Sequence, residues 1–126
     1  MGSPSDRRYA DTHEWHRLDG ELIVIGISQF AVDQLTDVTF AELKPEGTQV
    51  EAGGEIGEVE SVKTSSDVYS GMAGEIVEVN QQVVDDPSLL NSDPYGEGWL
   101  IKLKPGDPAE IDGLLDAAAY DEKNPA

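Results

Sequence analysis

Lys63 is the residue whose type and position could most directly support chemistry in this 126-residue sequence. It is the only cation between Glu58 and Ser70; residues on both sides of it favour β-strands, and residues 64–67 (Thr-Ser-Ser-Asp) favour a turn. We therefore expect a strand-turn-strand unit that exposes the lysine amine to water. Because no second lysine or histidine lies in this stretch to promote proton loss, the amine should be charged and a poor nucleophile. The pattern argues against direct amine catalysis.

A tight hairpin also presents a lysine well for enzymatic acylation, because the amine stands on a rigid base without bulky neighbours. Acylation would remove the positive charge of Lys63. A solvated lysine on an ordinary hairpin is the simpler interpretation, and it is the usual one for a single exposed lysine. The residues that surround Lys63 favour acylation.

The segments Glu60-Ser61-Val62-Lys63 and Ser66-Asp67-Val68-Tyr69-Ser70 closely resemble the lipoyl-lysine hairpin of the glycine cleavage system H protein family. Other segments resemble this family in its own order: Tyr9, His13-Glu14-Trp15, Ile25-Gly26-Ile27, Phe40-Ala41-Glu42-Leu43, 74–80 and 93–100. The resemblance runs from about Tyr9 to Tyr120, so it is far more specific than one short motif. Biotin carriers fit less well, because methionines typically flank their target lysine, whereas Val62 and Thr64 flank Lys63.

Short strands separated by turns are expected along most of the chain. Asp19-Gly20 predicts a hairpin turn between strands over 13–18 and 21–27, and Ser28 predicts the N-cap of a short helix. Such dense turns favour an antiparallel sandwich or barrel. From Pro108 onward, apolar residues at helical spacing predict one C-terminal helical run. The resemblance implies a mainly β, lipoyl-domain-like flattened β-barrel (barrel-sandwich hybrid) with short helices.

Composition limits the domain count and the classes of partner. We expect residues 1–8 to form a disordered or expression-derived tip and residues 9–126 to form a single lipoyl-carrier domain. A formal net charge of −18, from 26 acidic and 8 basic residues, argues against binding to nucleic acid or anionic membranes and favours basic protein surfaces. The sequence has no cysteine, no apolar run near the roughly 20 residues of a membrane span, and no signal-peptide pattern. We expect a bacterial cytoplasmic protein, or a mitochondrial matrix protein if the chain is a processed eukaryotic one.

The family resemblance implies a non-catalytic carrier with lipoic acid in amide linkage to Lys63. Such a carrier accepts the aminomethyl group of glycine from a PLP-dependent glycine decarboxylase and passes it to a tetrahydrofolate-dependent aminomethyltransferase. Dihydrolipoyl dehydrogenase then reoxidises the arm, and a lipoate ligase or lipoyl transferase attaches it. Three alternatives stay open: a lipoate-relay carrier that donates lipoyl groups to 2-oxo acid dehydrogenase subunits, a free-standing lipoyl domain, and an acidic binding domain that is never modified.

The resemblance also implies which residues contact the arm. Glu60 and Val62 flank Lys63 and would help the ligase to recognise it. A cleft that shelters the loaded arm from water is expected to contain two acids and three apolar residues: Glu14, Asp67, Ile27, Ala31 and Leu35. By residue type alone, Glu14 would be solvated and the three apolar residues would simply pack in the core.

The two histidines and Gly71 bear on a possible metal site and on the hairpin exit. His13 and His16 would point to opposite faces of a strand, and zinc-protease and EF-hand spacings are absent, so no metal site is expected. Gly71 stands where the family usually has proline after the Tyr-Ser pair. Because glycine is less rigid than proline, we expect a looser exit from the hairpin without loss of function.

Overall fold

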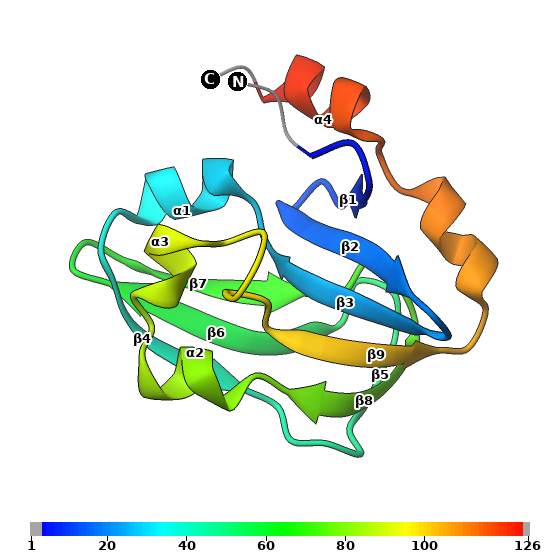
Figure 1. The fold of residues 1–126 in the computed structure, drawn as a ribbon, viewed down its shortest axis with the longest axis horizontal. Coiled ribbons are helices and arrows are strands. Elements are labelled where there is room, and N and C mark those ends of the chain that lie inside the picture. The colour runs from blue at the N-terminus through cyan, green and yellow to red at the C-terminus, as the bar shows by residue number, and fades with distance from the viewer. Residues whose placement is uncertain (1–3, 125–126) are drawn as a thin grey trace.

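The structure, a computed structural model, describes residues 4–124, and within them nine β-strands form two antiparallel sheets (Figure 1). The larger sheet has the strand order β1-β2-β3-β9-β8-β5, and the smaller sheet has the order β4-β6-β7. The strands of the larger sheet are β1 (Arg8–Tyr9), β2 (Glu14–Asp19), β3 (Leu22–Ile27), β9 (Ile101–Pro105), β8 (Gly74–Val79) and β5 (Gln49–Val50). Those of the smaller sheet are β4 (Val38–Leu43), β6 (Glu55–Ser61) and β7 (Ser65–Tyr69). The mainly β fold is therefore confirmed.

The first hairpin has the turn that its sequence predicts. Gly20 adopts a φ of 64°, which glycine tolerates better than other residues, and Asp19 pairs with Leu22 across the turn. At the other end of the hairpin, Glu14 pairs with Ile27. This register places a carboxylate and an apolar side chain next to the start of the following helix.

The two sheets bury one apolar core between them. Ile25 and Ile101 of the larger sheet and Val59 and Val68 of the smaller sheet are each at most 1 % exposed. Burying a side chain of this size contributes roughly 1.5–3 kcal/mol. A second, aromatic cluster lies on the other face of the larger sheet: Tyr9, Trp15, Val24, Ala117 and Tyr120. These two clusters hold the strands in register and attach the C-terminal segment to β1 and β2.

The helices are short and lie around the sheets (Figure 1). They are α1 (Gln29–Leu35), α2 (Gln81–Asp85), α3 (Leu89–Ser92), the 3-10 helix η1 (Pro108–Gly113) and α4 (Ala117–Lys123). Ser28 caps α1 as expected, because its side chain accepts a hydrogen bond from the Ala31 N–H. The helix α2 was not expected; Asn80 begins it by accepting a hydrogen bond from the Gln82 N–H.

The expectation of one continuous C-terminal helical run was wrong. The chain leaves the helical conformation between Gly113 and Ala117, where Leu115 forms an isolated antiparallel bridge with Tyr9. The backbone groups of Tyr9 and Leu115 exchange two hydrogen bonds, at 2.7 and 2.9 Å. Asp116 then starts a new helix by accepting from the Ala119 N–H at 2.8 Å. Pairing with β1 and a new N-cap thus outweigh the helical spacing of the apolar residues.

Contacts with the rest of the fold begin before Tyr9. Residues 1–3 of the expected tip lie outside the described residues, but the Arg7 guanidinium lies 4.6 Å from the centre of the Trp15 ring and donates to the Tyr95 carbonyl at 2.9 Å. Arg8 pairs with His16 in the larger sheet. No helix within residues 4–124 is long and apolar enough to cross a membrane.

Candidate functional site

Lys63 lies at the tip of the hairpin formed by β6 and β7. The hairpin closes through the Ser61 N–H, which donates to the Thr64 carbonyl at 2.7 Å, so that Val62 and Lys63 occupy the two central turn positions. The Ser61 hydroxyl oxygen also accepts from the backbone N–H groups of Lys63 (3.2 Å) and Thr64 (3.1 Å). The serine hydroxyl thus serves as hydrogen-bond acceptor for two turn N–H groups that have no partner in the strand ladder. The Lys63 side chain is exposed.

The expected position of the turn was therefore partly wrong. Among residues 64–67, only Thr64 belongs to the turn, because Ser65 pairs with Glu60 and Asp67 pairs with Glu58 in the ladder. Small polar side chains favour turns, but here the opposing strand β6 supplies ladder partners for three of them. Lys63 therefore lies at the centre of the turn and not at its edge.

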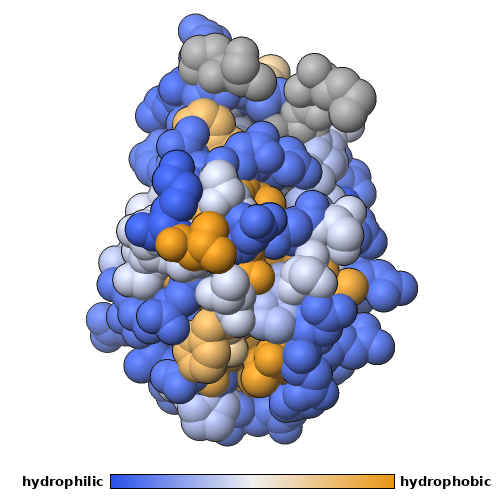
Figure 2. All heavy atoms as spheres, turned by 90° about the vertical axis from the view of Figure 1, so that its left-hand side faces the viewer, coloured by the Kyte–Doolittle hydropathy of each residue, from blue (hydrophilic) through white to orange (hydrophobic). Residues whose placement is uncertain are grey.

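The residues beside Lys63 differ in exposure. Glu60 is half-buried and pairs with Phe40 on β4, whereas Val62 has 67 % of its surface exposed. Figure 2 looks onto the end of the molecule that carries the hairpin tip; this end is mostly hydrophilic, with scattered hydrophobic residues. An enzyme that approaches Lys63 would meet an apolar side chain and a carboxylate on its N-terminal side.

A cavity of about 300 Å³ lies beside this hairpin, and all five expected cleft residues line it. Glu14 and Ile27 reach it from the first hairpin, Ala31 and Leu35 from α1, and Asp67 from β7. The structure thus brings together residues that are up to 53 positions apart in the sequence. Lys63 itself does not line the cavity, but Thr64, the next residue, does.

Both apolar and polar residues line the cavity. Ile27 and Leu35 are 3 % and 5 % exposed and belong to the main core, so core packing and cavity lining are compatible for them. The Glu14 and Asp67 side chains also line the cavity, together with the hydroxyl residues Ser65 and Ser66 of β7. Such a cavity suits a group with an aliphatic body and a positively charged end.

Glu14 is buried, contrary to the expectation from its residue type, with only 1 % of its surface exposed. Its two oxygens accept hydrogen bonds, Oε1 from the Thr12 hydroxyl and Oε2 from the Tyr69 N–H at 3.0 Å. Burial nevertheless raises the pKa of Glu14 to about 7, because removal from water disfavours the carboxylate more than these two donors favour it. Near neutral pH this group therefore lies close to half protonation.

Sequence reasoning missed several cavity residues. Thr12, His13 and Gln34 line the cavity, as do Val59 and Val68. The two valines could have been found from strand alternation, because inward residues on β6 and β7 face the cavity or the core. Thr12 and His13 could not, because His13 has a φ of 81° and the local chain path follows no strand or helix pattern.

Gly71 has specific contacts at the exit of the hairpin. Its N–H donates to Nε2 of His16 at 2.9 Å, and a β-carbon at this position would lie 2.9 Å from Leu114 Cδ2. His16 is fully buried, and burial lowers the pKa of its ring to about 4, so the ring is neutral and Nε2 can accept. The Gly71 backbone is thus hydrogen-bonded to a buried histidine, and the looser exit expected for glycine in place of proline stays a prediction.

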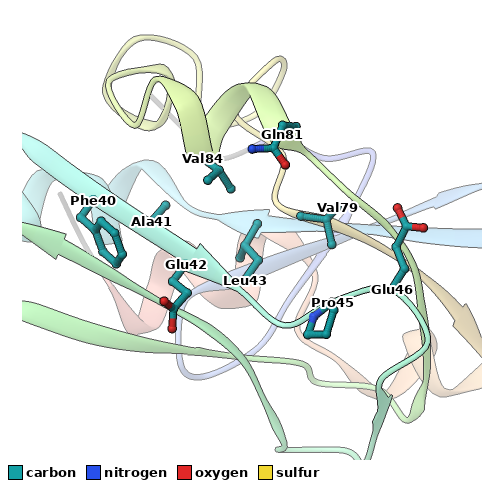
Figure 3. Close-up of a pocket in the computed structure, with 9 residues that line it drawn as sticks. All are labelled: Phe40, Ala41, Glu42, Leu43, Pro45, Glu46, Val79, Gln81 and Val84. Atoms are coloured by element: carbon teal, nitrogen blue, oxygen red, sulfur yellow. The ribbon is translucent and has the colours of Figure 1, made fainter.

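A second hollow lies elsewhere in the structure. A groove of about 570 Å³ runs between β4 and α2, lined by residues that include Phe40, Leu43 and Val84 (Figure 3). None of the residues that the sequence identified for the site lines this groove.

The described residues fit a lipoyl-lysine. The Lys63 amine is accessible for amide formation, and the neighbouring cavity offers apolar side chains for an aliphatic chain and carboxylates for an amine. Glu14 is suited to the amine in particular, because a cation beside it would favour its ionised form.

Comparisons with known proteins agree with this arrangement. The family model described as Glycine cleavage H-protein matches residues 7–125. The glycine cleavage system H protein of Symbiobacterium thermophilum is 51 % identical over 118 residues, covering 94 % of this chain and 92 % of the relative. That of Thermus thermophilus is 50 % identical over 122 residues, covering 97 % and 95 %.

A solved structure shows the same fold over nearly the whole chain. The crystal structure of a glycine cleavage system H protein from Mycobacterium marinum superposes with a TM-score of 0.89 at 40 % identity, covering 98 % of this chain and 99 % of that one. A likeness at this level confirms the lipoyl-domain-like, sandwich form of the fold. The chain belongs to the glycine cleavage H-protein family.

Proposed function

We propose that this protein is the lipoyl-bearing carrier of a glycine cleavage system, a component that moves a reacting group between enzymes without catalysis of its own. One observation carries the proposal: Lys63 stands at the centre of a hydrogen-bonded turn, one residue from a cavity lined by apolar side chains and by Glu14 and Asp67. The lipoyl group, when bound, would supply a reducible disulfide that accepts the aminomethyl cargo of glycine and later returns as a dithiol.

The chain's own residues would hold and protect this cargo. Ile27, Ala31 and Leu35 would contact the aliphatic part of the arm and exclude water from it. Glu14 and Asp67 would face the amine of the cargo. An ion pair with buried Glu14 would be screened less than a surface pair, because the carboxylate is out of water. The cargo would therefore survive the time between two enzymes.

The partners follow from this role. We propose that the loaded and unloaded forms dock on glycine decarboxylase, aminomethyltransferase and dihydrolipoyl dehydrogenase, and that a lipoate ligase or lipoyl transferase modifies Lys63 beforehand. Glu60 and Val62 would contact the modifying enzyme, because they lie next to the target amine. The relatives named above are bacterial, which supports a bacterial cytoplasmic location.

Glycine cleavage is favoured over lipoate relay, because the relatives at about half identity bear the name of the glycine cleavage component. Reconstitution separates the two roles. The lipoylated chain is mixed with the decarboxylase, and glycine–bicarbonate exchange is measured; the wild type should support exchange and Lys63→Arg should not. Transfer of lipoyl groups to a 2-oxo acid dehydrogenase subunit, without any exchange, would instead indicate a relay.

A further inference from the structure

One side chain of the C-terminal helix, Tyr120, contacts residues at the edge of the cavity without lining it. Its ring is 1 % exposed and stacks on Tyr9, with ring centres 4.7 Å apart and planes inclined by 18°. The hydroxyl passes beyond this stack and meets two polar atoms of other elements. It lies 2.6 Å from the Ser28 hydroxyl oxygen and 2.8 Å from Nδ1 of His13.

Both partners of this hydroxyl belong to the structure around the cavity. His13 lines the cavity directly, and Ser28 is the N-cap of α1, the helix that contributes Ala31 and Leu35. The His13 carbonyl also accepts from the Ser28 N–H at 2.9 Å, so these two residues are joined twice. Tyr120 therefore connects the segment before β2 to the first turn of α1.

The hydrogen bonds of the Tyr120 hydroxyl with Ser28 and His13 need no charged group. A phenol hydroxyl can donate one hydrogen bond and accept another, so it serves Ser28 and His13 whichever ring nitrogen of His13 carries the proton. Burial lowers the pKa of His13 and raises that of Tyr120 to about 12, so neither group is charged near neutral pH. His13 also keeps a φ of 81°, a backbone conformation that persists only when its surroundings hold it.

We propose that Tyr120 is a positioning residue for the arm cavity: its hydroxyl fixes His13 and the start of α1 relative to each other, and so keeps the cavity closed around the cargo. This inference rests on the proposed carrier function. It concerns one part of that function, in which the C-terminal helix controls how long the cargo is retained. The Lys123–Asp11 ion pair, at 3.2 Å, joins the same helix to the same segment from the exposed side.

The test uses Tyr120→Phe, with Tyr9→Phe as the matched control. Each change removes one buried hydroxyl from the same aromatic stack, but the Tyr9 hydroxyl donates to the Pro4 carbonyl at 2.7 Å and not to the cavity residues. The lipoylated proteins are loaded by the decarboxylase with glycine, and the spontaneous release of cargo is followed. We expect release to be about fivefold faster in Tyr120→Phe, as for the loss of one hydrogen bond, and unchanged in Tyr9→Phe.

A second readout needs no lipoyl group. Amide hydrogen exchange in the unmodified chain should be several-fold faster at Ala31 in Tyr120→Phe than in the wild type or in Tyr9→Phe, because this N–H donates to the Ser28 oxygen. His13→Asn is the second variant, for use if Tyr120→Phe does not fold. Asparagine tolerates the positive φ of position 13, and this position is not part of the Tyr9–Tyr120 stack. We expect it to release cargo about as fast as Tyr120→Phe, and the double variant to be no faster than either.

The outcomes separate this inference from the proposed function. A wild type that cannot be lipoylated or loaded would contradict the carrier role. Amide hydrogen exchange at Ala31 would still decide the role of Tyr120. Cargo release at the wild-type rate in a folded Tyr120→Phe, or in His13→Asn, would overturn the inference alone. Equal acceleration in Tyr9→Phe would also overturn it, because the effect would then reflect general stability.

Discussion

Glu14 combines two properties that oppose each other. Its carboxyl group is buried, which favours the protonated form, yet two donors point at its oxygens, which favours the carboxylate. The net result is a pKa of about 7 in the folded protein, against an ordinary value near 4.5. Loading the cavity with a cation would shift this balance toward the carboxylate, so in the proposed carrier Glu14 would release a proton when the charged cargo binds.

The raised pKa predicts a pH-dependent loss of stability. Between about pH 4.5 and pH 7 the folded state holds a proton on Glu14 that the unfolded state has released, so the free energy of unfolding falls as pH rises through this window. The expected loss is roughly 3 kcal/mol. Glu14→Gln cannot titrate, and its stability, measured by urea unfolding from pH 4 to pH 8, should lack this fall.

The exposed substitution Glu21→Gln is the control, because it changes the net charge by the same amount without touching the cavity. It should keep the wild-type pH profile. A Glu14→Gln profile that runs parallel to that of the wild type would show that Glu14 has the same pKa in the folded and unfolded protein, and the argument for proton exchange would fail.

Residue types alone could identify Lys63 but not the surroundings of Glu14 or Gly71. The lysine stands out because it is the only cation in its stretch. The burial of Glu14 depends on α1 and β7, which are distant in sequence, and the bond from Gly71 depends on His16, 55 positions away. The family resemblance, in contrast, supplied five residues that line the cavity, because it carries spatial information that residue types do not.

At the scale of elements, the β6–β7 hairpin determines how Lys63 is presented. Ser61 holds the turn with its backbone and its side chain, and the paired strands below it are anchored by Val59 and Val68 in the core. The turn can therefore keep one conformation although its residues are exposed. A modifying enzyme would meet a target of fixed shape.

Loss of the Ser61 hydroxyl should weaken this presentation. Ser61→Ala removes the acceptor for the Lys63 and Thr64 N–H groups, and we expect lipoylation by a lipoate ligase to slow by about fivefold, as for the loss of about 1 kcal/mol of turn stability. Ser65→Ala, also exposed and on the same hairpin, is the control and should be modified at the wild-type rate. Initial rates by intact-mass spectrometry give the comparison, and equal rates for both variants would argue against a role for the turn.

Elements with strong local signals were predicted well, and those that depend on distant partners were not. The first hairpin and the Ser28 helix cap match the structure, because turn chemistry and capping act locally. The C-terminal run and the turn after Lys63 were misplaced, because Leu115 pairs with Tyr9 and Ser65 pairs with Glu60. Backbone pairing across the fold overrode local propensity in both places.

At the scale of the whole molecule, the charge of −18 should govern docking. Acidic side chains lie opposite each other across the smaller sheet, where Glu58 pairs with both Glu42 and Asp67. Adjacent like charges cost stability unless a partner neutralises them. A basic surface on each partner enzyme would do so.

Association with the partner enzymes should therefore slow as salt rises. We expect the association rate, measured by stopped flow, to fall by about tenfold or more from low salt to several hundred millimolar. Lys63→Arg should show the same dependence, because the surface and not the arm carries the effect. A flat profile for the wild type would remove electrostatic steering from the account but leave the carrier role intact.

The site of lipoylation tests the central claim most directly. The chain is incubated with lipoate, ATP and a lipoate ligase, and its peptides are analysed by mass spectrometry, with Lys104→Arg as the lysine control. We predict lipoate on Lys63 alone in the wild type and in Lys104→Arg, and none in Lys63→Arg, which keeps the charge but has no acceptor amine. Lipoate on any other lysine, or a modified Lys63→Arg, would contradict the assignment of this hairpin as the functional centre.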